Sequence, residues 1–169
     1  LPPHAAEAFA LWTAFTWVID AAEVAPILTI NSPEKRCGKS TALSLLNKLV
    51  RRPLPSSNLS PPAVFRSIPK WKPTLLIDEG DAFLRENEEL RGVLNAGHTR
   101  DTAFVLRTVG DNHEPRRFYV WGAKAIALIG KLPDTLLDRS VVVPLQRKLA
   151  TQTLPKLRHA DAREFELLR

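Results

Sequence analysis

Residues 25–50 have the sequence APILTINSPEKRCGKSTALSLLNKLV, in which three local patterns follow one another. The first six residues, 25–30, are almost wholly apolar, as in a strand that is covered on both faces of a sheet. A polar turn follows, and residues 39–50 then carry leucines at spacings that suit one face of a helix. This stretch therefore predicts a strand, a loop and a helix in direct succession.

The loop ends in Gly38-Lys39-Ser40, at the start of the predicted helix. In that position backbone N–H groups and the positive end of the helix dipole bind phosphate oxygens. We expect Lys39 to bridge β- and γ-phosphate oxygens and Ser40 to ligate Mg²⁺, with Thr41 near the α-phosphate. A turn glycine followed by a solvated lysine is the alternative, which the positive helix end disfavours unless an anion is present. The pattern predicts binding of ATP, or a related nucleoside triphosphate, with Mg²⁺.

The loop departs from the usual pattern at its first position, where Pro33 stands in place of glycine. Proline has no N–H to donate and cannot adopt positive φ, so the loop must enter its turn by another route. Lys35 and Arg36 could contact phosphates or simply face solvent, and the sequence is equally compatible with both. We interpret Cys37 as a small loop residue rather than a redox-sensitive one. The predicted nucleotide-binding residues are Pro33, Glu34, Lys35, Arg36, Cys37, Gly38, Lys39, Ser40 and Thr41.

A second apolar run, 75–77, ends in the adjacent carboxylates Asp78 and Glu79. Ligands of open α/β sheets bind at the carboxyl ends of the strands. We expect Asp78 to hold the Mg²⁺ shell, together with Ser40, and Glu79 to orient and deprotonate the attacking water. A solvated acidic turn is the alternative. With Lys39 and Glu79 as catalytic residues, the two patterns predict a P-loop NTPase of the additional-strand, catalytic-glutamate type.

The remaining sequence continues the alternation of strands and helices. Its predicted elements are a helix over 4–19, a short strand within 51–62, a helix capped by Ser60 and running to about Ile68, strands over 74–77, 125–129 and 141–145, a helix over 90–96 that stops at Gly97, and a short helix over 134–138. The alternation predicts an α/β fold with a mainly parallel sheet flanked by helices. We divide the chain into a helix packed on the core (1–24), an ATPase core (25–148) and a lid start or linker (149–169).

Two extended segments, 103–109 and 116–121, predict a β-hairpin with a five- or six-residue tip, inserted ahead of the strand at 125–129. Cations beside aromatic residues such as Tyr119 and Trp121 can follow a phosphate backbone and stack on bases. An ordinary charged surface is the alternative. The candidate DNA contacts on the hairpin are Arg107, His113, Arg116 and Arg117.

Two residues near 125–140 are further catalytic candidates. Arg139 follows the predicted short helix, where an arginine of ring-forming ATPases reaches the γ-phosphate of a neighbouring subunit. An internal salt bridge with Asp134 or Asp138 is the alternative. At the end of the strand 125–129, where a polar sensor is usual, Lys131 is the available substitute, unless sensing comes from elsewhere. Further candidates for the finger are Arg100, Arg107 and Arg147.

Composition and charge indicate the number of domains, the kind of partner and the compartment. The 169 residues fit one domain, and a net charge of +6 makes an anionic partner plausible. The most apolar stretch, 8–19, is shorter than the roughly 20 residues that span a bilayer, so we expect a buried helix and no membrane contact. The single cysteine agrees with a reducing cytosol, and we predict a cytoplasmic protein.

The chain also resembles a family of P-loop domains of unassigned function from phage, plasmid and genomic-island proteins described as primase-helicases. The resemblance spans about residues 10–148 and implies an ATPase coupled to DNA replication of a mobile element, acting on single-stranded or duplex DNA, and a homo-oligomeric ring. A non-motor ATP switch that DNA does not stimulate is the competing interpretation. The resemblance rests on residues 16–17, 24–26, 32–39, 77–79, 95–98, 130–136 and 138–140.

Overall fold

A computed structural model describes residues 2–153, 157 and 165–166, and contains one sheet of five parallel strands in the order β2-β3-β6-β1-β7. The sheet strands are β1 (Ile27–Ser32), β2 (Pro53–Ser56), β3 (Thr74–Ile77), β6 (Lys124–Ile129) and β7 (Ser140–Pro144). The helices are α1 (Ala5–Val18), α2 (Lys39–Leu49), α3 (Pro61–Trp71), α4 (Gly80–Phe83), α5 (Glu88–Ala96) and α6 (Asp134–Leu137), with single 3₁₀ turns η1 (Ile19–Ala21) and η2 (Arg100–Thr102). The predicted α/β fold with a mainly parallel sheet is confirmed.

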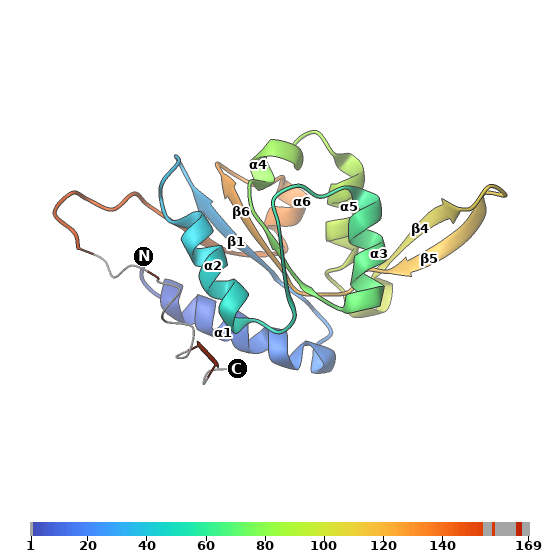
Figure 1. The fold of residues 1–169 in the computed structure, drawn as a ribbon, viewed down its shortest axis with the longest axis horizontal. Helices are drawn as coiled ribbons and strands as arrows, with labels where there is room; N and C mark the ends of the chain where they lie inside the picture. The colour runs from blue at the N-terminus through green and yellow to red at the C-terminus, as the bar shows by residue number, and fades with distance from the viewer. Residues whose placement is uncertain (1, 154–156, 158–164, 167–169) are drawn as a thin grey trace.

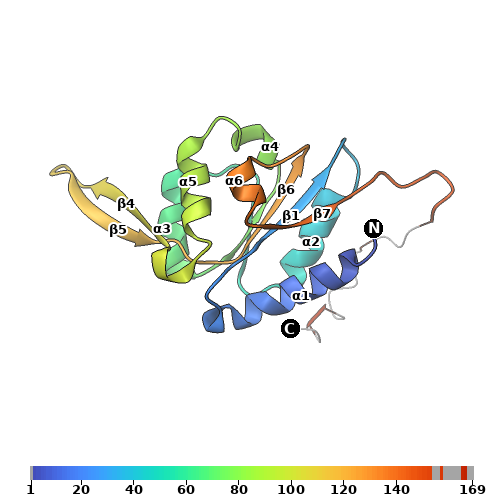
Figure 2. The ribbon, with the colours of Figure 1, turned by 180° about the vertical axis from the view of Figure 1, so that it is seen from behind.

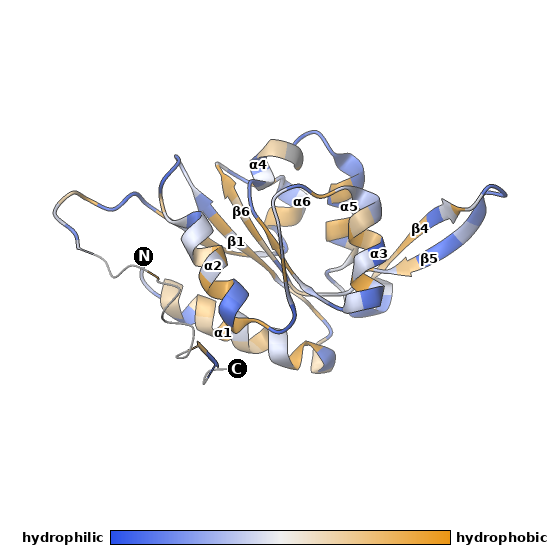
Figure 3. Cartoon of the chain, viewed as in Figure 1, coloured by the Kyte–Doolittle hydropathy of each residue, from blue (hydrophilic) through white to orange (hydrophobic). Residues whose placement is uncertain are grey.

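Helices cover both faces of the sheet, as Figures 1 and 2 show from opposite sides. Successive residues of a strand point to opposite faces. In β1, Ile27 packs in the cluster that contains residues of α3, α5 and α6, whereas Leu28 packs in the cluster that contains residues of α1 and α2. The same division separates Leu75 from Leu76 in β3. The inner strands β1, β3 and β6 are mostly apolar because both of their faces are buried, whereas the edge strands β2 and β7 are partly exposed, and Figure 3 shows the hydrophobic colour along β6.

A separate two-stranded sheet lies ahead of β6 in the chain. Strands β4 (Phe104–Val109) and β5 (Glu114–Tyr119) pair antiparallel and project beyond α3 as a hairpin (Figure 1). The hairpin was expected, but β5 begins earlier than predicted, because Pro115 already pairs with Thr108. The connecting turn is therefore residues 110–113, shorter than the predicted tip.

The five predicted helices form close to their expected bounds, whereas α4 was not predicted. Ser60 precedes α3, but its side chain makes no capping hydrogen bond, whereas Asn87 caps α5 by accepting from the Leu90 N–H at 2.8 Å. On α1, Trp12 is buried, but Leu11 is 72% exposed, so the helix is buried on one side only.

Among the described residues no helix has both the length and the apolar character needed to cross a bilayer. Most of the predicted lid or linker, 149–169, lies outside the described residues.

A buried lysine joins the start of β6 to the end of α5. Lys124 is 1% exposed, and its ammonium donates to the carbonyls of Gly97 (2.9 Å) and Gly122 (2.7 Å). Burial lowers the pKa of Lys124 to about 7. A Cβ atom on Gly97 would lie 2.2 Å from the Val120 carbonyl oxygen and 2.6 Å from the Lys124 nitrogen. Glycine is therefore required at 97 by close packing.

Candidate phosphate and metal site

The predicted phosphate and metal residues meet at the carboxyl edge of the sheet. The loop 33–38 leaves β1 and enters α2, while Asp78 follows β3, with β6 lying between the two strands. The Ser40 hydroxyl donates a 2.8 Å hydrogen bond to Asp78 Oδ2. Two oxygens that are distant in sequence thus lie side by side at the start of α2.

Lys39 is held over the loop by oxygen atoms. Its ammonium donates to Ser32 Oγ at 2.7 Å and to the Glu34 carbonyl at 3.3 Å, and the Ser32 hydroxyl donates to the same carbonyl at 2.6 Å. None of these acceptors carries a charge, so the positive charge of Lys39 remains available to an anion. Ser32, the last residue of β1, was not among the predicted site residues, although it begins the segment 32–39 on which the family resemblance rests.

The start of α2 has the features of an anion site. Gly38 occupies the N-cap position with no side chain to accept a hydrogen bond, and the first turn of α2 contains no acidic residue. The first N–H groups of a helix need an acceptor, and the helix dipole favours a negative one. A Cβ atom built on Gly38 would meet nothing within 4 Å, so the space beside Gly38 is open. These features are the ones that favour an anion at the start of a helix.

The loop enters its turn by a route that does not involve Pro33. Positive φ angles occur at Arg36 (64°) and Gly38 (90°), whereas Pro33 lies exposed at the beginning of the loop. The side chains of Glu34, Lys35 and Arg36 are also exposed. Cys37 is 9% exposed and packs against the core cluster of α2, which agrees with a small structural residue.

The two predicted acidic residues have different environments. Asp78 is half-buried, and its Oδ1 accepts a 2.9 Å bond from the N–H of Glu79. Glu79 is exposed and has a φ of 56°, and the described part of the chain offers its carboxylate no ion pair. Asp81 was not predicted as important, yet its Oδ1 accepts from the N–H of Ile129 at 2.9 Å and ties α4 to the end of β6. Asp78 is thus fixed, while Glu79 faces solvent.

The structure provides few protein ligands for a metal ion. Across the described residues no three His, Cys, Asp or Glu side chains gather into a metal-binding group. Ser40 and Asp78 therefore supply the oxygens available beside the loop. Mg²⁺ commonly takes one or two protein oxygens and completes its octahedron with phosphates and water. The donor set suits Mg²⁺ bound with a nucleotide and does not suit a structural metal.

The predicted sensor Lys131 is exposed and lies beside the start of the loop. It lines an open depression of about 260 Å³ with Asn31, Pro33 and Gly130. Asn31 donates to the Gly130 carbonyl at 3.0 Å, but its Oδ1 is buried without a partner among the described residues. Asn31 was not predicted as a site residue, although a polar residue at the end of an apolar strand is a usable signal.

Arg139 lies at the opposite edge of the sheet from the loop. Its carbonyl accepts from the N–H of Ile27, the first residue of β1, at 2.9 Å, whereas the loop follows the last residue of that strand. The guanidinium donates to the Thr135 carbonyl at 2.6 Å, and among the described residues it forms no ion pair with Asp134 or Asp138. Arg139 therefore cannot contact phosphates bound at its own loop.

The alternative candidates for the finger have partners elsewhere. Arg147 approaches Glu34 at 3.9 Å, and Arg107 donates to Glu89 at 2.7 Å. Arg100 donates to the carbonyls of Asp20 and Ala22. Arg147 and Arg107 are therefore in ion pairs, whereas Arg100 and Arg139 both donate to backbone carbonyls. Of these two, Arg139 is the one that follows α6.

The predicted DNA contacts on the hairpin are not equivalent. Arg107 is engaged by Glu89 and lies over the ring of Phe65 at 5.4 Å, so its charge is already compensated. Arg116, Arg117 and His113 are exposed. Trp121, proposed from the sequence to stack on bases, is 7% exposed and packs in the core, so its ring has no free face for a base.

Comparison with known proteins adds no assignment: no protein-family model matches the chain, and no curated protein is found to be similar to it. The functional inference therefore rests on the site itself.

Proposed function

We propose that this chain is a Mg²⁺-dependent ATPase domain of the P-loop class. The observation that carries the proposal is the 2.8 Å contact between Ser40 and Asp78, formed where an uncapped helix N-terminus meets the end of a buried strand. The position of β6 between β1 and β3 supports the additional-strand, catalytic-glutamate type. Each feature has a simpler explanation alone, but the proposal accounts together for a lysine ammonium, a helix N-terminus and two oxygen atoms of the kind that Mg²⁺ prefers.

The residues of the site have separate tasks in this proposal. A bound nucleotide with Mg²⁺ supplies the phosphoryl group and the divalent charge. The N–H groups of α2 and the ammonium of Lys39 hold the phosphates, and Lys39 exchanges its bond to Ser32 for a phosphate oxygen. Asp78 fixes Ser40 for the metal. Glu79, exposed at the same edge, orients a water molecule and accepts its proton, while Lys131 contacts the phosphates from the end of β6.

Hydrolysis in this scheme is completed by a second copy of the chain. Arg139 lies at the sheet edge opposite its own loop, with a guanidinium held by a single backbone carbonyl. Such an arginine can stabilise transferred phosphate charge only in a neighbouring subunit. This position supports a homo-oligomeric ring. The net charge of +6 and the exposed Arg116 and Arg117 on the hairpin support DNA as the partner, in the replication of a mobile element.

Calorimetric titration with ATP tests the nucleotide site. Wild type is expected to bind ATP in the presence of Mg²⁺, and Lys39→Ala to bind at least about tenfold more weakly, because a charge-assisted contact to phosphate is lost. Lys70→Ala is the matched control, since it removes an equal charge from an exposed position in the last turn of α3, outside the loop. Equal affinities for Lys39→Ala and Lys70→Ala would rule out the proposed phosphate cradle.

A further inference from the structure

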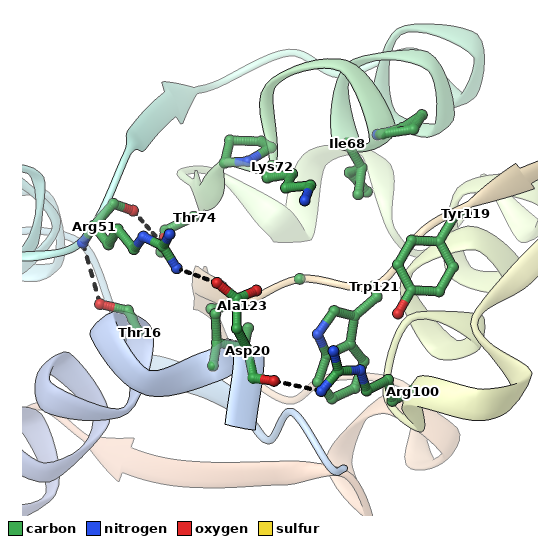
Figure 4. Close-up of a pocket in the computed structure, with 14 residues that line it drawn as sticks. Thr16, Asp20, Arg51, Ile68, Lys72, Thr74, Arg100, Tyr119, Trp121 and Ala123 are labelled. Atoms are coloured by element: carbon green, nitrogen blue, oxygen red, sulfur yellow. Dashed lines mark hydrogen bonds and ion pairs between the residues drawn. The ribbon is translucent and has the colours of Figure 1, made fainter. Parts of the chain in front are cut away.

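A second pocket lies at the amino-terminal edge of the sheet, away from the phosphate-binding loop (Figure 4). Its volume is about 160 Å³, and its lining includes Thr74, the first residue of β3, and Ala123, which precedes β6. The end of α1, the end of α3 and the base of the hairpin enclose it. We call it the basic pocket, after Arg51, Lys72 and Arg100 in its lining.

The basic pocket carries more positive than negative charge. Its lining has these three cations and one carboxylate, that of Asp20. Asp20 pairs with Arg51 at 2.7 Å, and the hydrogen bond from Arg51 lowers the pKa of this carboxyl below its usual value. Arg100 donates only to backbone carbonyls, and no carboxylate among the described residues lies within 4.0 Å of the Lys72 ammonium. Lys72 and Arg100 are therefore without an ion pair among the described residues, although their charges also act on Asp20 and help to lower its pKa.

The basic pocket also contains a buried donor without an acceptor. Trp121 lines it and is 7% exposed, and its indole N–H has no hydrogen-bond partner among the described residues. Leaving such a group unpaired is costly, and unpaired buried donors call for a specific explanation. Figure 4 shows the Lys72 ammonium pointing into the same space. An acceptor bound in the pocket would satisfy the indole and the ammonium together.

The basic pocket is continuous with one face of the hairpin. Arg117 and Tyr119 lie two residues apart on β5 and so point to the same face, which Phe104 shares as the cross-strand partner of Tyr119. The Arg117 guanidinium lies 3.9 Å from the Phe104 ring centroid, and the Phe104 and Tyr119 rings are 5.2 Å apart. Tyr119 itself lines the pocket. The cation Arg117, the exposed ring of Phe104, the half-buried ring of Tyr119 and the pocket thus follow one another.

We propose that the basic pocket binds a backbone phosphate of a single DNA strand that runs along this face of the hairpin. The inference rests on the proposed function, because it gives the DNA its path. Alternating aromatic and cationic groups are how proteins bind single strands without reading sequence. The strand contacts Phe104, Arg117 and Tyr119 on the hairpin, and its phosphate is held by Lys72 and the Trp121 N–H.

The test compares two lysines of the same segment. Binding of a fluorescent oligothymidylate is measured by anisotropy at several salt concentrations, with Mg²⁺ and a non-hydrolysable ATP analogue. Lys72→Gln is expected to weaken binding about fivefold and to reduce the slope of log affinity against log salt by about 0.7, the contribution of one phosphate contact in a single strand. Lys70→Gln removes an equal charge from an exposed position outside the pocket and should leave the slope unchanged.

A second variant addresses the indole. Trp121→Phe removes the N–H and keeps an aromatic ring, and it should weaken binding without changing the salt slope, because no charge is lost. If wild type binds the oligomer and neither Lys72→Gln nor Trp121→Phe changes the affinity, the pocket assignment is wrong while the proposed ATPase stands. If wild type does not bind the oligomer at all, the DNA path and the DNA part of the proposed function are both overturned.

Discussion

The hydroxyl of Ser40 lies 2.8 Å from the carboxylate of Asp78, although 38 residues separate them in the chain. The bond joins the first turn of α2 to the end of β3 across the carboxyl edge of the sheet. This pair is the strongest reason to expect Mg²⁺ beside the loop, because a hydroxyl and a carboxylate are both hard oxygen ligands.

Asp78→Asn should therefore weaken ATP binding only when Mg²⁺ is present. An amide keeps the hydrogen bond to Ser40 but loses the negative charge that favours the cation, and we expect an affinity about tenfold lower. Titration calorimetry with Mg²⁺ and with EDTA measures both conditions. Asp138→Asn, an exposed carboxylate near the opposite edge, is the control. A loss of equal size in EDTA would mean that Asp78 acts on the fold and not on the metal.

Arg139 should act between subunits. Arg139→Ala and Glu79→Gln are each expected to be inactive alone, because one lacks the finger and the other lacks the base. In a mixture, the arginine of a Glu79→Gln subunit can complete the site of an Arg139→Ala neighbour, so hydrolysis should return to a measurable fraction of wild type. Persistent inactivity of mixed oligomers would contradict the trans role.

The unit at residues 25–50 could be predicted because each of its parts has a local pattern: an apolar run, a glycine before lysine, and leucines at helical spacing. The meeting of Ser40 and Asp78 could be predicted because the loop before Ser40 and Asp78 itself each follow the carboxyl end of a parallel strand. The order of the strands has no local pattern, since it depends on which distant segments pair.

Other features depend on contacts that spacing does not reveal. Arg107 was expected on a DNA-binding surface, but Glu89 on α5 pairs with it. The alternation of β5 predicts the faces of Arg116 and Arg117, but not that Trp121 would lie in the core. The sequence also gives no sign that Lys124, at the start of an apolar strand, is buried. Its burial depends on hydrogen bonds to the carbonyls of Gly97 and Gly122, and Gly97 is distant in the sequence.

Gly97→Ala should destabilise the fold. The added methyl group would meet the Val120 carbonyl and the Lys124 ammonium, and a forced shift of backbone costs about 3 kcal/mol in the free energy of unfolding. Gly92→Ala on the same helix meets nothing within 4 Å and should instead stabilise by up to about 1 kcal/mol, since alanine favours the helix. Urea denaturation compares them, and equal effects of the two changes would refute the packing argument.

Lys124 should make stability depend on pH. Its folded pKa of about 7 lies below the usual value of 10.5, so above pH 7 the unfolded chain binds more protons at this residue than the folded one. The free energy of unfolding should then rise with pH between about 7 and 10, by at most about 1.4 kcal/mol per unit. In denaturation series at pH 7, 8 and 9, the free energy of unfolding of Lys124→Met should not show this rise with pH. An identical slope in both proteins would show that Lys124 is charged in the fold.

The central claim is hydrolysis of ATP at this site, and the rate of phosphate release with Mg²⁺ tests it most directly. Wild type should hydrolyse ATP, and single-stranded DNA should increase the rate. Glu79→Gln should bind ATP with wild-type affinity but hydrolyse it at least about a hundredfold more slowly, because the general base is lost. Full activity in Glu79→Gln, or none in wild type with and without DNA, would contradict the account.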